Sequence, residues 1–265
     1  MDLPDAVGHP AFPSTLESLI GHHGGTVLDI ARESLEREDV LEFEVPEVRL
    51  LPPLYPTSIR TCRAFEDPAD PATPLYSRGD HRAVLGPDEA LPWPRFTQAL
   101  DFECQWACVV GTPGRNLTAS RAARHVFGYV LLVEWVARDV EQEEARAGVG
   151  PGKSRVATSL GPWVATADEV DPASMELSVS VDDEPWGEAT APQMRWGFPE
   201  ILAYASLDED VAEGDVLASG PFAGGCGKDA GHLPEPGSTL ELEGTGLGAL
   251  RTTIGPRPAR PDQVG

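Results

Sequence analysis

Glycine and proline interrupt this chain so often that long helices are disfavoured throughout. The 265 residues include 27 glycines and 26 prolines. Glycine weakens the interior of helices and strands, and proline removes a backbone donor and ends a helix. Such a chain is expected to form short elements, chiefly strands and loops. We therefore predict a β-rich α+β fold with peripheral helices.

Hydrophobic periodicity gives the approximate positions of these elements. Strands are predicted at residues 41–45, 102–110, 126–133, 176–181, 215–219 and 239–243. Short helices are predicted at residues 14–37, 137–147 and 199–205, and a long loop at residues 66–95. The run Asp182-Asp-Glu184 can turn the strand before it into a hairpin.

A proline-rich connector at residues 46–56 suggests how the chain is organised. It separates a small N-terminal region, residues 1–47, from a main domain, residues 48–259, which a tail at residues 260–265 follows. The length suits one large domain with a small appendage.

The charge balance restricts the class of partner. The chain has 43 acidic and 20 basic residues, a formal net charge of -23. Nucleic acids and anionic membrane surfaces are bound through basic patches, so neither is expected as a partner. No apolar run reaches the ~20 residues of a membrane-spanning helix.

Cysteine usage and the first residues predict a reduced, cytoplasmic protein. The N-terminus lacks the basic and apolar regions of a signal peptide. If Cys104 and Cys108 share a strand they lie ~13 Å apart, too far for a disulfide. Cys62 and Cys226 form no Cys-x-x-Cys pair either, so free thiols are the expectation.

Seven short motifs together carry a family resemblance. They are Asp101-Phe-Glu103, Phe127-Gly-Tyr129, Ala137-Arg-Asp139, Thr158-Ser-Leu-Gly-Pro162, Gly214-Asp-Val216, Ser219-Gly220 and Gly246-Leu-Gly248. In this order they resemble the fumarylacetoacetate hydrolase family over roughly residues 48–255. The resemblance implies mixed sheets rolled around a central site, a homodimer, and small 2-oxo acids or β-diketones as substrates.

The resemblance also implies a divalent-metal site for Mg²⁺ or Mn²⁺. The family motif Asp-Phe-Glu-x-Glu puts two glutamates on one strand face, and this chain has Glu103 and Gln105 there. Glu134 takes the place of a ligand aspartate, Thr61 that of another, and Pro68 that of a catalytic histidine. The predicted metal set is thus Glu103, Glu134 and Gln105, completed by waters. Alternatively, Glu103 and Gln105 form a hydrogen-bonded polar pair, and Glu134 is a strand-end carboxylate that interacts favourably with the dipole of a helix starting nearby.

The proton carrier of the family is also missing from its place. The histidines are His9, His22, His23, His81, His125 and His232. His81 could fold back from the long loop, or stay in solvent. Glu66 and Asp67 lie nearer the lost position, and a carboxylate in an apolar cleft can be tuned toward neutral pH; a solvated turn is the alternative. Asp229 corresponds to the histidine's carboxylate partner.

A cation is still available to the site. The family's lysine is not in register, so Arg155 or Lys153 could supply the positive charge. Arginine holds carboxylates well but does not shuttle protons. Arg138 either binds substrate or forms an ion pair with Asp139 or a neighbour. The family's Ser-Gly-Thr loop becomes Ser219-Gly-Pro-Phe222 and loses a hydroxyl, and Phe222 is expected to make the pocket more apolar.

Three hypotheses about function remain open. The first is a diverged enzyme with lyase, isomerase or cyclase chemistry on a small carbonyl compound, such as a 2-oxo acid, a β-diketone or a polyketide-like molecule. Its predicted catalytic residues are Glu103, Glu134, Arg155, Lys153 and Glu66, and its substrate-binding residues are Arg138, Gln105, Thr61 and Phe222. The alternatives are a metal-dependent carbon–carbon hydrolase or decarboxylase, and a non-catalytic binding protein with its cleft filled by Trp135, Phe222 or Pro68.

Overall fold

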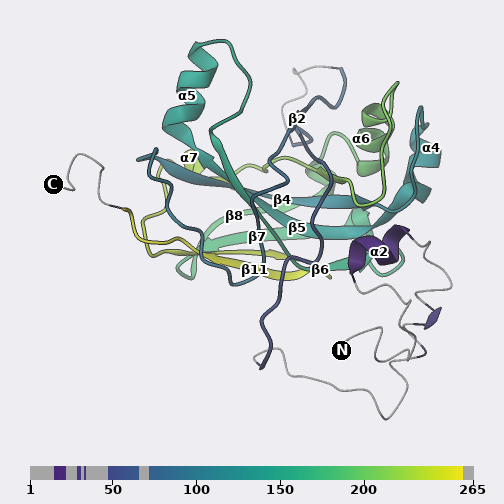
Figure 1. Cartoon of the computed structure of the whole chain (residues 1–265), viewed down its shortest axis with the longest axis horizontal. Coiled ribbons are helices and arrows are strands. Elements are labelled where there is room, and N and C mark those ends of the chain that lie inside the picture. Colours follow the sequence, from purple (N-terminus) through teal and green to yellow (C-terminus); the bar gives the residue numbers. More distant parts are fainter. Residues whose placement is uncertain (1–14, 22–28, 31–32, 34–46, 66–71, 259–265) are drawn as a thin grey trace.

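Two β-sheets packed on each other organise the chain (Figure 1). The structure, a computed structural model, describes residues 15–21, 29–30, 33, 47–65 and 72–258. Seven strands form the larger sheet, in the order β2-β1-β9-β4-β5-β6-β3. They are β1 (Ile59–Cys62), β2 (Tyr76–Arg78), β3 (Val84–Leu85), β4 (Leu100–Val110), β5 (Val126–Ala137), β6 (Arg155–Thr166) and β9 (Val216–Ala218). The sheet is mixed, because β1 pairs with β9, and β3 with β6, in parallel.

The smaller sheet is antiparallel and has the order β11-β10-β7-β8. Its strands are β7 (Glu176–Val181), β8 (Glu184–Thr190), β10 (Thr239–Gly244) and β11 (Gly248–Thr253). Asp182 and Asp183 join β7 to β8 with φ of 52° and 65°, the left-handed pair of a two-residue hairpin turn. The predicted hairpin is confirmed.

Short helices lie around the sheets (Figure 1). They are α2 (Leu16–Gly21), α4 (Ala119–Ala122), α5 (Arg138–Arg146), α6 (Phe198–Ala205) and α7 (Gly227–Ala230), with 3-10 turns at η2 (Ala123–His125), η3 (Pro172–Ser174) and η4 (Ala191–Gln193). Across the described part of the chain, no helix has the length and apolar character needed to cross a membrane.

Alternation along β4 separates a hydrophobic core from a polar face. Phe102, Cys104 and Trp106 enter the larger core cluster, which also contains side chains of β7 and β10. The opposite face of β4 begins with Asp101, Glu103 and Gln105, and continues with Ala107 and Val109 in a second apolar cluster. A buried polar group therefore stands at one end of an otherwise apolar face of the larger sheet.

The predicted β-rich fold is confirmed, and one predicted loop is wrong in part. Within residues 66–95, β2 pairs with β1 and β3 pairs with β6. Strands of three and two residues carry almost no periodic signal, and only pairing with distant strands makes them extended. Residues 66–71, the predicted strand at 41–45 and most of the predicted helix at 14–37 lie outside the described residues. All four cysteines are free, as predicted, and all four are buried.

Candidate active site

Glu103 and Glu134 stand directly opposite each other on β4 and β5, two neighbouring strands in the middle of the strand order of the larger sheet. Glu103 on β4 is the cross-strand partner of Glu134 on β5, which in turn faces Thr158 on β6. Directly opposed residues have Cβ atoms about 4.5–5.5 Å apart, and like charges at that distance are destabilising. Both glutamates are buried, with 7% and 2% exposure. The arrangement therefore needs positive charge close by.

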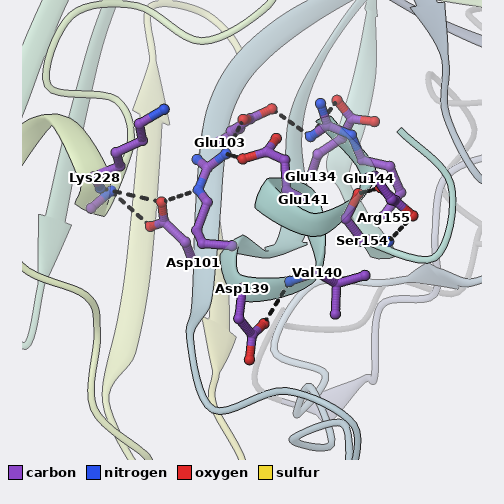
Figure 2. A network of polar contacts seen from close by, with 12 residues as sticks. Asp101, Glu103, Glu134, Asp139, Val140, Glu141, Glu144, Ser154, Arg155 and Lys228 are labelled. Carbon is purple, nitrogen blue, oxygen red and sulfur yellow. Dashed lines mark hydrogen bonds and ion pairs between the residues drawn. The ribbon is translucent and has the colours of Figure 1, made fainter. Parts of the chain in front are cut away.

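Arg155, the first residue of β6, supplies this charge from between the two carboxylates (Figure 2). Its Nη1 lies 2.6 Å from Oε2 of Glu103 and 3.9 Å from Oε2 of Glu134. Its Nε is buried and has no hydrogen-bond partner among the described residues. The guanidinium is thus anchored at one edge and retains an unused donor.

A one-residue bulge explains why Arg155 reaches this face. Thr158 shares a face with Glu134, so regular alternation would put Val156 on that face too. The pairing instead steps from Trp135–Ala157 to Val136–Arg155, with one extra residue in β6. Bulges of this kind re-aim side chains. Val156 turns into the core, and Arg155 takes the side of the carboxylates.

Arg138, the first residue of α5, binds the other side of Glu103. Its Nη1 donates to Oε1 of Glu103 at 2.8 Å and to Glu141 at 2.9 Å, and its Nε donates to Asp101 at 2.7 Å. The predicted ion pair with a neighbour is therefore made with Glu141, whereas Asp139 accepts hydrogen bonds from the segment before β4. Arg138 is therefore paired with three carboxylates, those of Asp101, Glu103 and Glu141.

Helix α7 closes the network at Asp101. The backbone N–H groups of Gly227 and Lys228 donate to Asp101 at 2.8 Å and 3.2 Å. A Cβ on Gly227 would lie 2.5 Å from Oδ1 of Asp101, so only glycine permits this approach. Asp229, the predicted partner of the lost histidine, is exposed on the same helix.

The neutral members of the site surround Glu134. Gln105 donates from Nε2 to Oε2 of Glu134 at 3.1 Å and accepts from the N–H of Gly220 at 2.9 Å. The hydroxyl of Thr61, on β1, is turned toward Glu134 but makes no hydrogen bond of normal geometry among the described residues. Gly79 packs on Glu134, since a Cβ there would lie 3.0 Å from Oε1.

The two glutamates differ in the direction of their pKa shifts. Burial raises the pKa of Glu134 above the ordinary value of 4.5, and the charge of Arg155 offsets only part of that effect. Burial acts on Glu103 as well, but the charges of Arg155 and Arg138 outweigh it and the pKa falls below 4.5. Glu103 is therefore an anchored carboxylate, while Glu134 is a buried carboxyl with a greater tendency to hold its proton.

These residues do not fit a divalent metal ion. Both oxygens of Glu103 accept from arginines, and Oε2 of Glu134 accepts from Gln105. The third ligand position holds the neutral amide of Gln105, which brings no charge. No group of three His, Cys, Asp or Glu side chains able to hold a metal occurs among the residues that the structure describes.

The remaining predicted residues lie away from the carboxylates or outside the described chain. Lys153 is exposed, with its Nζ 4.3 Å from the ring of Phe96. Phe222 packs edge-to-face on Phe65, with ring centroids 6.0 Å apart, in the larger core cluster. His81 is exposed. Glu66, Asp67 and Pro68 fall within residues that the structure does not describe.

Arg155 is the most exposed of the three charged groups that converge at the site. Its side chain is 12% exposed, compared with 9% for Glu103 and 2% for Glu134. Trp135 does not fill the space over the carboxylates, because it belongs to the opposite face and donates from Nε1 to Ser159 at 2.9 Å.

Sequence reasoning missed the contributions of Asp101, Glu141 and Gly79. Glu141 carried a usable signal, because a carboxylate three residues after Arg138 on a helix lies on the same face. Asp101 alternates with Glu103, which places both on one face of a strand. The contact of Gly79 had no local signal, since its segment packs against a strand 55 positions away in the chain.

Comparisons with known proteins agree with this architecture. The family model described as "Fumarylacetoacetate (FAA) hydrolase C-terminal" matches residues 55–255. The solved structure of a fumarylacetoacetate hydrolase from the psychrophilic Exiguobacterium antarcticum superposes with a TM-score of 0.81 at 25% identity, covering 96% of this chain and 91% of that one.

Two further relatives have comparable identity. A structure of 2-hydroxyhepta-2,4-diene-1,7-dioate isomerase from Mycobacterium marinum has a TM-score of 0.70 at 25% identity, covering 82% of this chain and 81% of that one. An uncharacterised protein of Pyrococcus abyssi is 26% identical over 188 residues, covering 69% of this chain and 80% of that protein.

Proposed function

The chain belongs to the fumarylacetoacetate hydrolase family, and from this we propose that it is an enzyme acting on a small carbonyl compound, such as a 2-oxo acid or a β-diketone. The observation that carries the proposal is the guanidinium of Arg155 held between two buried carboxyl groups. Relatives that share the fold include a 2-hydroxyhepta-2,4-diene-1,7-dioate isomerase and a fumarylacetoacetate hydrolase.

Arg155 is suited to hold an anionic oxygen. It is the most exposed of the three groups that converge, and its buried Nε–H has no hydrogen-bond partner among the residues that the structure describes. A guanidinium binds a carboxylate or an enolate oxygen through its planar donors and keeps its charge at any working pH. In the proposed complex Arg155 binds the substrate's carboxylate or developing enolate oxygen, and Glu103 keeps the guanidinium in place.

In the proposed reaction Glu134 moves the proton. Its Oε2 lies 3.9 Å from Nη1 of Arg155. A carbonyl oxygen bound to Arg155 would therefore bring the adjacent carbon of the substrate close to the carboxyl group of Glu134. In an isomerisation, Glu134 takes a proton from that carbon, the electron pair forms the enolate, and the proton returns to another carbon. Atoms and electrons balance without water or a co-reactant. A lyase or cyclase step can begin with the same transfer.

A second candidate, a non-catalytic binding protein, is favoured by one observation. Gln105 is fully buried, and Glu134 is nearly so, so the polar group resembles a closed structural network. Bound ligand without proton transfer would support this candidate.

The test is deuterium exchange in heavy water. Purified protein is incubated with a panel of 2-oxo acids and β-diketones, and loss of the proton signal beside the carbonyl is followed by NMR. We expect exchange with at least one compound, and a loss of about 10²-fold or more in E134Q, in the usual range for a general acid–base residue. R155M should raise KM as well as lower kcat. E241Q, on the exposed face of the smaller sheet, is the matched control.

The outcomes separate the candidates. Exchange that is unaffected by both E134Q and R155M would contradict the assigned roles. Absence of exchange across the panel, with a ligand that still raises Tm, would favour the binding protein.

A further inference from the structure

The positive charge of the site comes from the chain itself. The places that carry metal-binding carboxylates in the family motif are occupied by Glu103, Glu134, Gln105 and Thr61. The structure brings these residues together, and the guanidinium of Arg155 lies at 2.6 Å and 3.9 Å from the two remaining carboxylates. We propose that Arg155 is the resident cation of this site and excludes a divalent metal ion from it.

The geometry leaves a metal ion without ligands. Mg²⁺ needs oxygens at about 2.0–2.1 Å in a near-octahedral arrangement. The Oε2 atom of Glu103 is already bonded to Arg155 and its Oε1 atom to Arg138. An ion between Glu103 and Glu134 would have to displace the Arg155 guanidinium. It would also lie next to a second cation, Arg138, in a buried environment where repulsion is poorly screened.

The neutral residues match a cation of one charge. Gln105 donates its amide hydrogen to Glu134 across 3.1 Å and is fully buried. A carboxylate in place of Gln105 would face Glu134 directly. The single positive charge of Arg155 could not compensate this carboxylate as well as Glu134. Thr61, also buried, adds no charge. Gln105 and Arg155 therefore compensate each other relative to a metal site. The amide of Gln105 removes one negative charge, and the guanidinium of Arg155 supplies one positive charge where a metal ion would supply two.

A gain of metal binding tests the proposal. R155A removes the internal cation, and R155A/Q105E also restores the third carboxylate. Binding of Mn²⁺ is measured by calorimetry and electron paramagnetic resonance, and by the shift of Tm with Mn²⁺ concentration. We expect no site-specific binding in the wild-type protein at ~1 mM Mn²⁺, and an affinity at least ~100-fold higher in the double variant, because affinity rises with ligand charge. Its Tm should rise with Mn²⁺ by mass action.

Control variants keep the outcome interpretable. R155K retains a positive charge and should still exclude the metal, whereas adding E134Q to the double variant should abolish the gained binding. If the double variant folds only with Mn²⁺, as circular dichroism would show, that rescue is itself the expected result. R155A alone, with its neutral Gln105, should bind more weakly than the double variant.

Two results would overturn the proposal. The first is Mn²⁺ binding to the wild-type protein that E134Q removes. The second is a folded R155A/Q105E protein with no more affinity for Mn²⁺ than the wild type. Metal binding is measured without turnover, so neither result depends on the reaction that the site performs.

Discussion

The larger sheet contains two clusters in which buried arginines meet carboxylates, and they differ in how completely the acids are compensated. In the Arg60 cluster, Arg60 on β1 is 3% exposed and binds Asp215 at 3.1 Å and Glu209 at 2.8 Å. Glu209 also accepts from Arg78 and Tyr76, and the hydrogen bonds from the two arginines lower its pKa to about 2.

The site cluster, formed by Asp101, Glu103, Glu134, Arg138 and Arg155, leaves one acid only partly compensated. The pKa of Glu103 is lowered, whereas burial raises that of Glu134. In the Arg60 cluster, which we take as structural, the more exposed acid Glu209 is paired with two arginines, Arg60 and Arg78. A chemical site keeps a carboxyl whose protonation can change, and pKa values that diverge between neighbours point to function. The contrast between the two clusters can be tested by measurements of stability and activity.

The largest effect is expected from R138M. The change leaves Asp101 and Glu103 buried without their shared cation, and breaking a buried pair from one side costs about 3–5 kcal/mol. Urea unfolding measures the loss. E141Q removes only the partner that is 26% exposed, and should cost less than about 1 kcal/mol. Equal losses in the two variants would contradict the assignment of Arg138 as the main cation of this end of the cluster.

R60M should have a smaller effect on stability. It leaves Asp215, which is 5% exposed, without its arginine partner, but Glu209 is 35% exposed and can be hydrated. We expect a loss of about 2–3 kcal/mol in the free energy of unfolding. R78M, at a side chain that is 60% exposed, is the control and should cost less than about 1 kcal/mol. The folded R60M protein should catalyse deuterium exchange into the carbonyl compounds at the wild-type rate. A selective loss of this activity would show that the two clusters are coupled.

The glutamates of the site should respond oppositely to pH. A lowered folded-state pKa makes Glu103 stabilising above its unfolded value near 4.5, and this contribution is lost as pH falls. A raised pKa makes Glu134 favour folding at low pH, and that contribution is lost as pH rises from 4.5 through its folded pKa. At pH 7, E103Q should cost about 1–3 kcal/mol, and E134Q less. Urea midpoints across pH 4–8 measure both; parallel profiles would contradict the contrast.

E209Q should have the smallest effect. Glu209 stabilises the fold above pH 4.5, and this contribution is lost as pH falls toward its folded pKa of about 2. Because the side chain is 35% exposed, the cost at pH 7 should stay below about 1 kcal/mol. Thermal unfolding of E209Q and wild type at pH 7 and pH 2.5 gives the comparison. A difference that grows on acidification would be the wrong sign.

Much of the fold could be predicted because its signals are local. The apolar run from Val126 and the alternation from Glu176 mark β5 and β7 without reference to any other part of the chain. The strands β2 and β3 had no such signal: each depends on a partner, β1 or β6, that the local sequence does not identify. Their extended backbone is decided by pairing.

The choice between Arg155 and Lys153 as the cation could not be made from the sequence. The two residues stand two positions apart in a glycine-containing segment, and either could have faced the carboxylates. In the structure Lys153 lies on Phe96 at the surface, and Arg155 begins β6. The difference follows from where β6 starts to pair with β5, which no property of the segment alone specifies.

The sequence by itself determined that Glu103 and Gln105 share a strand face, because side chains alternate with a period of two in any strand. It also determined that the family's metal-binding set is incomplete. Only the tertiary structure decided what compensates Glu103 and Glu134. One extra residue in β6 shifts its register against β5 and turns Arg155, in place of Val156, toward the two acids. Cross-strand register depends on how both strands pack together, so the position of Arg155 beside the two acids is set only when the chain folds.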